Sequence, residues 1–263
     1  MKIAIIGAGE MGGAFAQGLL NGTLFNAADI TVANPHEGKL EKFARQGASV
    51  TIDNRVAVQD ADFVAIVVKP DVVPAVLEEI KDVLDFSSQI VLNMAASVSL
   101  RQLKAWLATA DGFPCVMQVL PNVGIAVRQS MTFIAPDESD QATVDRVRAI
   151  FDDLGQTIVT TEQMLPAGTA MAGCAIAYVM RYVRAASEAG VELGFKAGQA
   201  RDITLQTIQG AVSLLRETGM HPEAGVDTVT TPGGLTIKGL NTLERYGFSN
   251  AVIQGIKAGM KEL

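Results

Sequence analysis

Three glycines near the start of the chain have the spacing of a phosphate-binding turn. The sequence GAGEMG, residues 7–12, directly follows a short apolar run and precedes a helical pattern, AFAQGLL. In such a turn Gly7 permits a tight bend, Gly9 lets the backbone approach a pyrophosphate, and Gly12 lets helix and strand pack closely. The N-terminus of the following helix attracts the phosphate charge. Because the motif lies between a strand and a helix, it predicts a dinucleotide-binding site rather than a merely structural turn.

The next apolar run ends without a carboxylate. Sites that prefer NAD usually place Asp or Glu there to bind the ribose hydroxyls, whereas this chain has Asn34, Pro35 and His36. Nothing at this position repels a 2′-phosphate, and His36 or Lys39 could lie near one, although His36 could equally be an exposed residue at a helix start. We therefore predict NADPH as the cofactor, with NADH as the alternative.

Two further loops follow apolar runs that we interpret as strands. Ligands of open α/β sheets bind outside the carboxyl ends of the strands, so these loops are expected to line the cofactor and substrate crevice. We expect the backbone of Lys69 to contact the cofactor, since a loop lysine is more often solvated than catalytic. The predicted cofactor-binding residues are Gly7, Gly9, Glu10, Met11, Gly12, Asn34, Pro35, Val68, Lys69, Pro70, Ala95 and Ala96.

A second glycine-rich stretch, TTPGG at residues 230–234, interrupts a region that otherwise has helical patterns. Apolar residues at helical spacing follow it, so Gly233 and Gly234 would leave the first N–H groups of a helix uncovered. Such a helix start binds anions, especially carboxylates, and Thr236 adds a hydroxyl donor. The stretch predicts a cradle for a small carboxylate substrate, the alternative being a plain turn between helices.

Short apolar runs alternate with amphipathic segments over the first part of the chain. Strands apolar on both faces that alternate with helices indicate a parallel sheet covered on both sides, the doubly wound α/β class with a Rossmann-like topology. HEGKLEKFARQG (36–47) is one such amphipathic segment, with Gly47 as its C-terminal stop. The expected strands are residues 2–7, 30–34, 48–52, 63–69, 89–95, 115–120, 131–135 and 157–161.

From residue 162 onward the strand pattern disappears. Residues 174–193, closed by Gly194, and residues 197–218 have long helical patterns rich in apolar side chains. We predict a dinucleotide-binding domain over 1–161 and an all-helical dimerisation and substrate-binding domain over 162–263. These helices carry more apolar surface than their own packing would cover, which favours a homodimer or higher homo-oligomer; packing on the first domain is the alternative.

Composition excludes several classes of protein. The chain is 49% hydrophobic and 19% charged with a net charge of −7, which is typical of a globular protein and unsuited to binding nucleic acid. The apolar run at the N-terminus is too short for a signal peptide, and residues 163–180 are expected to be buried in the protein rather than in a membrane. Cys115 and Cys174 indicate reduced core thiols of a cytoplasmic protein, and His36 and His221 are too few for a metal site.

Several motifs together resemble the pyrroline-5-carboxylate reductase family. IIGAGEMG, VVKP, LPNVG, GVELGF, QTIQGA, ETGMHP, VTTPGGLTIKGLNTLERYGF and AVIQGIKAGM occur in the family's order over essentially the whole chain. The resemblance implies an N-terminal dinucleotide domain, a helical dimerisation domain, and active sites at the dimer interface. It also implies hydride transfer from NAD(P)H to 1-pyrroline-5-carboxylate, giving L-proline in the last step of proline biosynthesis. It assigns substrate binding to Asn122, Gly233, Gly234, Leu235 and Thr236, with Thr236 as the catalytic residue.

The chain departs from the family pattern at three places. Residues 172–178 read AGCAIAY without the usual serines and proline, LPNVG at 120–124 replaces a Met-Pro-Asn-Thr-Pro pattern, and Leu235 stands where Thr or Ala is common. These changes put hydroxyl contacts to the substrate in doubt and leave the backbone cradle intact. We expect them to alter affinity or substrate range more readily than the type of reaction.

The predicted reaction needs no obvious general acid. A protonated pyrroline nitrogen makes the ring an iminium, which accepts hydride without a further proton, so catalysis reduces to positioning the two reactants. A β-hydroxyacid dehydrogenase, the first alternative, must move an alcohol proton, and the expected helix over 174–193 has no lysine to do so. The second alternative is a non-catalytic NADP(H)-binding protein, suggested by the departures at Ala172 to Ala177.

Overall fold

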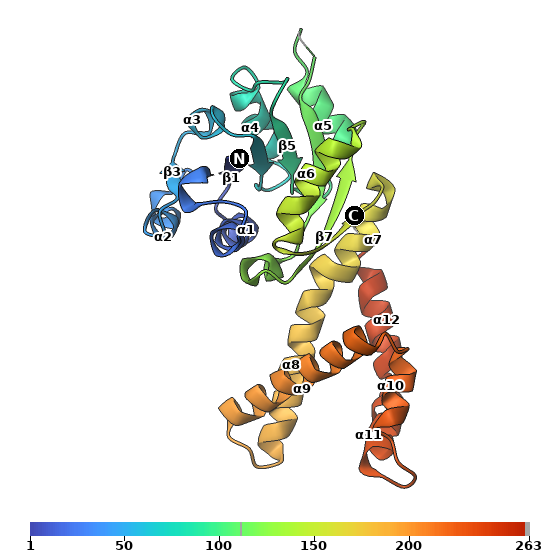
Figure 1. The fold of residues 1–263 in the computed structure, drawn as a ribbon. Coiled ribbons are helices and arrows are strands. Elements are labelled where there is room, and N and C mark those ends of the chain that lie inside the picture. Colours follow the sequence, from blue (N-terminus) through green and yellow to red (C-terminus); the bar gives the residue numbers. More distant parts are fainter. Residues whose placement is uncertain (111, 261–263) are drawn as a thin grey trace. The chain divides into compact units, whose positions relative to one another are not determined.

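The computed structural model describes residues 1–110 and 112–260 (Figure 1). The chain divides into two compact units, Met1–Gly173 and a second that begins at Cys174. Residues 162–173 belong with the first unit by packing, because Leu165, Gly168 and Ala170 are buried there. The predicted domain boundary at residue 162 therefore differs from the boundary of the compact units.

The first unit contains an eight-stranded sheet in the order β3-β2-β1-β4-β5-β6-β7-β8. All eight expected strands are confirmed. The central strands β1, β4 and β5 are buried at every position, as expected for a sheet covered on both faces. The strands are β1 (Ile3–Ile6), β2 (Ile30–Ala33), β3 (Ser49–Thr51), β4 (Phe63–Ile66), β5 (Ile90–Asn93), β6 (Cys115–Leu120), β7 (Ser130–Pro136) and β8 (Gly155–Val159).

The parallel pairing expected where strands alternate with helices is confirmed for β1 to β6, and the sheet changes direction at β7. Strands β1 to β6 pair in parallel, but β7 runs antiparallel to β6, and β8 is again parallel to β7. The connection between β6 and β7 holds only a short 3₁₀ helix, Val123–Val127, and a parallel crossover needs a dozen or more residues. The connection from β7 to β8 is longer and contains helix α6 (Gln141–Asp152). This crossover lets β8 run parallel to β7.

Helices cover both faces of the sheet and bury two apolar cores (Figure 1). Along β1, Ile3 and Ile5 belong to one core and Ala4 and Ile6 to the other, as the two-residue period of a strand requires. Helices α1, α2 and α6 contribute to the first core, and helices α3, α4 and α5 to the second. The helices are α1 (Glu10–Asn21), α2 (Glu41–Ala44), α3 (Asn54–Val58), α4 (Val73–Ile80), α5 (Leu100–Leu107), α6 (Gln141–Asp152) and α7 (Leu165–Gly168).

The second unit contains helices only, within its described residues. The two expected long helices are confirmed as α8 (Ala175–Glu192) and α9 (Ala197–Thr218), and Gly194 after α8 has a φ of +100°. Tyr178 Oη donates to the Gly255 carbonyl at 3.2 Å, which ties α8 to α12. The remaining helices are α10 (Pro222–Thr228), α11 (Leu235–Arg245) and α12 (Phe248–Ala258).

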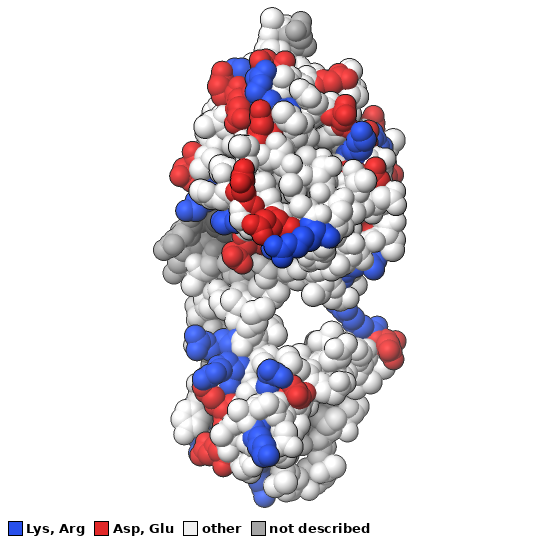
Figure 2. Space-filling model, turned by 90° about the vertical axis from the view of Figure 1, so that its left-hand side faces the viewer, with Lys and Arg blue, Asp and Glu red and all other residues white. Residues whose placement is uncertain are grey.

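Little of this helical unit is buried within one chain. Among its described residues only Ala200 is buried, where α9 crosses close to Gly190 of α8. Much of the face of this unit shown in Figure 2 carries neither acidic nor basic side chains, whereas the first unit shows both kinds interspersed. Leu193, Leu235 and Tyr246 are 79%, 86% and 83% exposed. These helices therefore leave a large apolar surface uncovered in the single chain.

Two regions that were expected to be buried are only partly covered within the single chain. The run Glu162–Glu192 is long and apolar enough to cross a membrane by length and composition, yet only 17% of its most apolar window is buried. Leu165, Gly168 and Ala170 are buried within the chain, whereas Tyr178 to Met180 of α8 are exposed in the single chain. The expected burial of residues 163–180 inside the protein therefore stays a prediction for the assembled form. Cys115 and Cys174 are unbridged and partly buried. Cys115 begins β6 and packs against the first core, and Cys174 begins the helical unit. Burial raises the pKa of the Cys115 thiol.

Candidate functional site

The turn between β1 and α1 is built around two glycines that the protein itself requires. Gly7 has a φ of +109°, and its N–H donates to the Ala33 carbonyl at 2.8 Å, which joins the turn to the end of β2. A Cβ at Gly12 would collide with the carbonyl oxygen of Gly7. Bulkier residues would therefore break the bend at Gly7 and the close approach of α1 to the turn at Gly12.

Gly9 differs from these two glycines because no protein atom requires it. Its φ of −72° and ψ of −165° are open to any residue, and a Cβ built on it would have no heavy atom within 4 Å. Gly9 is also the N-cap of the twelve-residue helix α1, and no side chain caps that end. An uncapped helix start with open space in front of it suits a phosphate group. The turn thus fits the predicted pyrophosphate.

This space opens into a cleft of about 780 Å³ at the carboxyl ends of β1, β2 and β4. The cleft brings together eight of the predicted cofactor residues, namely Gly7, Gly9, Glu10, Met11, Asn34, Pro35, Val68 and Lys69. His36 and Lys39 also line it. Gly12, Pro70 and Ala95 do not line it. Gly12 packs against the backbone of Gly7, and Ala95 is buried at the start of the loop after β5.

Asn34 stands at the end of β2 where a carboxylate would favour NAD. Asn34 is buried, and its side-chain amide makes two hydrogen bonds to the backbone beside the cleft. Oδ1 accepts from the N–H of Ala8 at 3.2 Å, and Nδ2 donates to the His36 carbonyl at 3.2 Å. The neutral amide therefore orients the glycine turn and the start of the following loop. The end of β2 carries no negative charge toward the cleft.

The far wall of the cleft was not foreseen. It comes from residues after β3 and along α4, and includes Asn54, whose Nδ2 donates to Oε2 of Glu79 at 2.9 Å. No sequence motif marks these residues. They could have been predicted only from the parallel sheet, in which the carboxyl ends of β1, β2 and β3 lie at the same edge. The other lining residues that were not predicted are Ile6, Ala33, Ile52, Val67, Val72, Ala75, Val76 and Met94.

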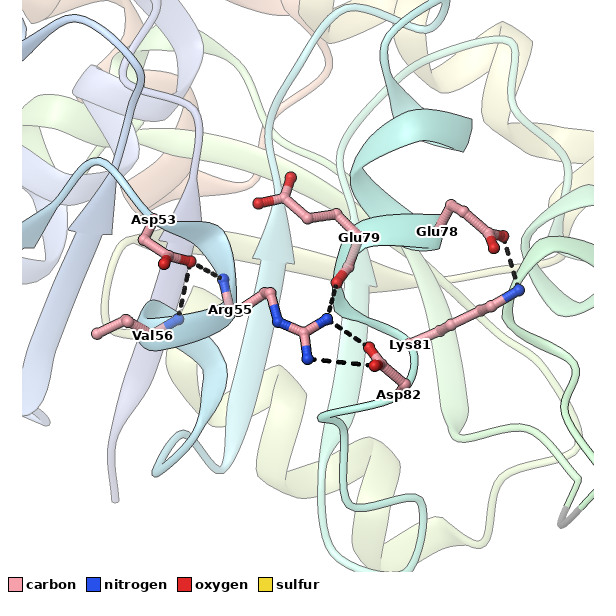
Figure 3. Close-up of polar contacts among 7 residues, drawn as sticks. All are labelled: Asp53, Arg55, Val56, Glu78, Glu79, Lys81 and Asp82. Carbon is pink, nitrogen blue, oxygen red and sulfur yellow. Dashed lines mark hydrogen bonds and ion pairs between the residues drawn. The ribbon is translucent and has the colours of Figure 1, made fainter.

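A polar cluster behind this wall fixes α3 against α4 (Figure 3). Asp53 caps α3, accepting from the N–H groups of Arg55 and Val56. The Arg55 guanidinium pairs with both carboxylate oxygens of Asp82, at 2.6 and 3.1 Å, and donates to the Glu79 carbonyl at 2.8 Å. The Arg55 guanidinium lowers the pKa of Asp82. The cluster thereby holds the helix that carries Glu79.

A second cleft of about 360 Å³ lies within the first unit at the carboxyl ends of β5 and β6. Of the predicted residues it contains Ala96. Glu162 also lines it, and its Oε1 accepts from the Leu100 N–H at 2.7 Å, which anchors the start of α5. The remaining lining residues are Ser97, Val98, Ser99, Gln118, Leu120, Gln163, Leu165, Pro166 and Thr169.

Asn122, predicted to bind substrate, lines neither cleft. Its Oδ1 accepts from the Gly124 N–H at 2.9 Å, which caps the 3₁₀ helix Val123–Val127. Its Nδ2 donates to the Ala172 carbonyl at 3.3 Å, and its backbone N–H donates to Ser130 Oγ at 3.1 Å. Both polar ends of the side chain thus serve the structure of the first unit.

The glycine-rich stretch that was predicted to form a carboxylate cradle lies at the start of α11 in the helical unit. Gly233 has a φ of +71°, and Gly234 is the N-cap of an eleven-residue helix that no side chain caps. Thr236 is exposed in the first turn, and Leu235 is 86% exposed. The first N–H groups of α11 and the Thr236 hydroxyl are therefore open to a ligand in the single chain.

The fold and the first cleft define a dinucleotide-binding oxidoreductase with a helical second unit. Residues 2–97 match the family described as NADP oxidoreductase coenzyme F420-dependent, and residues 162–263 match the family described as pyrroline-5-carboxylate reductase dimerisation. Together with similarity along the whole chain, these matches confirm the resemblance found in the sequence. The chain belongs to the pyrroline-5-carboxylate reductase family.

Relatives and solved structures agree with this assignment. Pyrroline-5-carboxylate reductase of Methanosarcina acetivorans is 32% identical, over 96% of this chain and 94% of that protein. Pyrroline-5-carboxylate reductase 1 of Dictyostelium discoideum is 34% identical over 97% of this chain, and the chain spans about half of its length (48%). The structure of Plasmodium falciparum pyrroline carboxylate reductase with NADP bound has a TM-score of 0.88 at 23% identity, covering 100% of this chain and 96% of that one. The last likeness shows that the fold is shared.

Proposed function

We propose that this protein reduces 1-pyrroline-5-carboxylate to L-proline with NADPH, the last step of proline biosynthesis. The observation that carries the proposal is the presence, in a chain of this family, of two helix starts left open by glycine. One, at Gly9, suits a pyrophosphate, and the other, at Gly234, suits a small carboxylate.

The end of β2 supports NADPH rather than NADH. The neutral Asn34 side chain does not repel a 2′-phosphate, and His36 and Lys39 line the same cleft. The Plasmodium falciparum neighbour was solved with NADP bound. Reduced nicotinamide held in the cleft would supply the hydride, and NADH stays the alternative donor.

The chain's own residues are proposed to position the substrate. The N–H groups at the start of α11 and the Thr236 hydroxyl bind its carboxylate, so that the imine carbon has one orientation. Leu235 offers a side chain without a hydroxyl, and the segment Ala172 to Ala177 likewise offers none. Binding of the carboxylate therefore depends on the backbone and on Thr236.

We further propose that the protein works as a homodimer or larger homo-oligomer joined through the helical unit. The apolar side chains that one chain leaves exposed on α8, α9 and α11 support this, because surfaces of that size are covered in stable proteins. The family match over residues 162–263 is described as a dimerisation family. The cytoplasmic location stays a prediction.

The proposal is tested by the loss of reduced-nicotinamide absorbance when NADPH and DL-1-pyrroline-5-carboxylate are mixed with the protein. Turnover with the pyrroline, followed by detection of proline, is the expected result. Parallel assays use NADH in place of NADPH, and a 3-hydroxy acid with NADP⁺. Activity on the hydroxy acid alone would overturn the proposed reaction.

Neither alternative function gains support from the structure. A β-hydroxyacid dehydrogenase needs a base for the alcohol proton, and α8 contains no lysine. The basic side chains of that helix are Arg181 and Arg184, and a guanidinium group is a hydrogen-bond donor without an acceptor. A non-catalytic NADP(H)-binding protein would bind the nucleotide without turning over the pyrroline, which the same assay detects.

A further inference from the structure

Two buried amide side chains lie beneath the loop that follows β5. Asn93 ends β5 and Gln118 lies in β6, and the register of the two strands pairs them directly. Asn93 is fully buried and Gln118 is 2% exposed. Buried amides are costly unless they are hydrogen-bonded, so their partners show what they stabilise.

Their hydrogen bonds converge on the peptide groups of Ala95. The Ala95 carbonyl accepts from Asn93 Nδ2 at 3.0 Å and from Gln118 Nε2 at 2.8 Å. The Ala95 N–H donates to Asn93 Oδ1 at 3.3 Å. Asn93 Nδ2 also donates to Gln118 Oε1 at 2.8 Å, which fixes the orientation of both amides. Together the two side chains hold the Ala95 backbone from both its N–H and its carbonyl.

Ala95 is the point where the chain leaves the sheet and enters the second cleft. The next residues, Ala96 and Ser97, line that cleft, and Ser97 has a φ of +68°, which is unusual for a residue with a side chain. The far end of the loop is held by Glu162, which accepts from the Leu100 N–H. The loop is thus anchored at both ends.

We propose that Asn93 and Gln118 are positioning residues, which set the Ala95–Ala96 peptide so that the loop presents a fixed wall to the reacting end of the cofactor and substrate. The inference rests on the proposed function. Two neutral amides suit this task because each donates and accepts, so the network has one hydrogen-bonding pattern. They also place no charge beneath a site where an iminium is reduced.

The test replaces Gln118 with methionine, which keeps the length of the side chain and removes both hydrogen-bonding ends. Gln118→Met is expected to lower kcat for NADPH-dependent pyrroline reduction about tenfold, because a small misplacement of reacting groups is costly. The KM for the pyrroline should change less, since the carboxylate cradle in α11 is untouched. Asn93→Leu removes the β5 side of the same hydrogen-bond network. It should likewise lower kcat and change the KM for the pyrroline less.

Gln89 offers a matched control at the opposite end of β5. It is also a buried glutamine, and its Nε2 donates to the carbonyls of Val58 and Ala61 at 2.6 and 2.8 Å. Gln89→Met should lower the melting temperature as Gln118→Met does and leave kcat near that of the wild type. The comparison of the two variants separates an effect on the stability of the protein from an effect on the position of the Ala95–Ala96 peptide.

Each outcome has a definite meaning. If the wild type reduces the pyrroline and Gln118→Met has the same kcat as Gln89→Met, the positioning role is overturned. If neither Gln118→Met nor Asn93→Leu folds while Gln89→Met does, the amide pair serves stability alone and the role is again overturned. An inactive wild type that binds NADPH would instead overturn the proposed function.

Discussion

At the scale of single residues, Gly9 is the most informative glycine, because the fold itself does not require a glycine at that position. Gly7 and Gly12 are required by a positive φ and by a backbone contact, whereas at Gly9 a side chain would meet no protein atom. We predict that Gly9→Val folds normally and loses NADPH binding, because its methyl groups fill the space that the pyrophosphate needs. Fluorescence titration with NADPH measures the loss.

Gly198 provides the control for this substitution. A Cβ at Gly198 of α9 also meets no heavy atom within 4 Å, and the residue lies outside the nucleotide cleft. Gly198→Val should therefore bind NADPH like the wild type. Unchanged binding by Gly9→Val would contradict the assignment of the turn to the pyrophosphate.

Thr236 is the side chain in the first turn of α11 that we predict to donate to the substrate carboxylate. Loss of one charge-assisted hydrogen bond costs about 1.5 kcal/mol or more, so Thr236→Val is expected to raise the KM for the pyrroline roughly tenfold. Thr242→Val is the control, since the Thr242 hydroxyl, further along α11, donates to the Lys238 carbonyl at 2.8 Å. Steady-state kinetics at saturating NADPH measure both. Equal KM values for the two variants would rule out Thr236 as the anchor.

At the scale of elements, most of the fold could be predicted because apolar runs and helical spacing are local. All eight strands and the helices α8 and α9 occur close to their expected ranges. The direction of β7 was missed because it depends on the length of the connection after β6, not on the strand itself. The sequence could not show which surface covers α8, because apolar composition does not say whether the covering surface belongs to the same chain.

The candidate site was predictable only where a motif marks it. Glycine-rich motifs mark the turn before α1 and the start of α11, and the structure places both at helix starts that no side chain caps. Their ligands stay predictions. Asn54, Glu79 and Gln118 carry no such mark, because only the folded sheet brings the ends of different strands to one edge. Asn122 was assigned to the substrate by resemblance, and its amide proved to be a cap within the first unit.

Asp153, at the end of α6, links three elements and gives a prediction at this scale. Its carboxylate accepts from the N–H and hydroxyl of Thr23, after α1, and from Arg128, before β7, at 2.7 to 2.8 Å. Burial raises the pKa of Asp153, but these hydrogen bonds and the Arg128 charge outweigh it, so the pKa lies below its usual value. Asp153→Asn is expected to lower the free energy of unfolding by about 1 to 3 kcal/mol near neutral pH.

The pH dependence of this effect has a definite sign. The pKa is lower in the folded protein, so the stabilisation is present above the unfolded value of about 3.9 and is lost as the pH falls through the folded pKa. Urea unfolding of wild type and variant should therefore converge in acid. Asp152→Asn, next along the helix and paired with Arg148 on the surface, should change stability by about 0.5 kcal/mol or less. If the free energies of unfolding of wild type and Asp153→Asn differed by the same amount at all pH values, the link between the lowered Asp153 pKa and stability would be contradicted.

At the scale of the whole molecule, the two units differ in how much of their apolar surface is buried. The first unit buries two cores around its sheet, whereas only one described residue of the helical unit, Ala200, is buried. On α9, Ile203 and Leu214 are 48% and 45% exposed and lie three helical turns apart on one face. A polar face that includes Gln206 and Gln209 runs beside it. We expect another copy to cover the apolar face rather than the polar one.

We therefore predict that the protein sediments as a dimer or larger assembly and that Ile203→Lys combined with Leu214→Lys shifts it toward the 27.7 kDa chain. Two charges in a buried apolar interface stay unpaired, which is strongly unfavourable. Gln206→Lys combined with Gln209→Lys adds the same charge to the polar face and should leave the assembly intact. Sedimentation velocity and pyrroline reduction, measured on the same samples, should fall together only in the first pair. A wild-type protein that sediments as a single chain and turns over the pyrroline would show that the exposed apolar surface of α8, α9 and α11 is not an assembly surface.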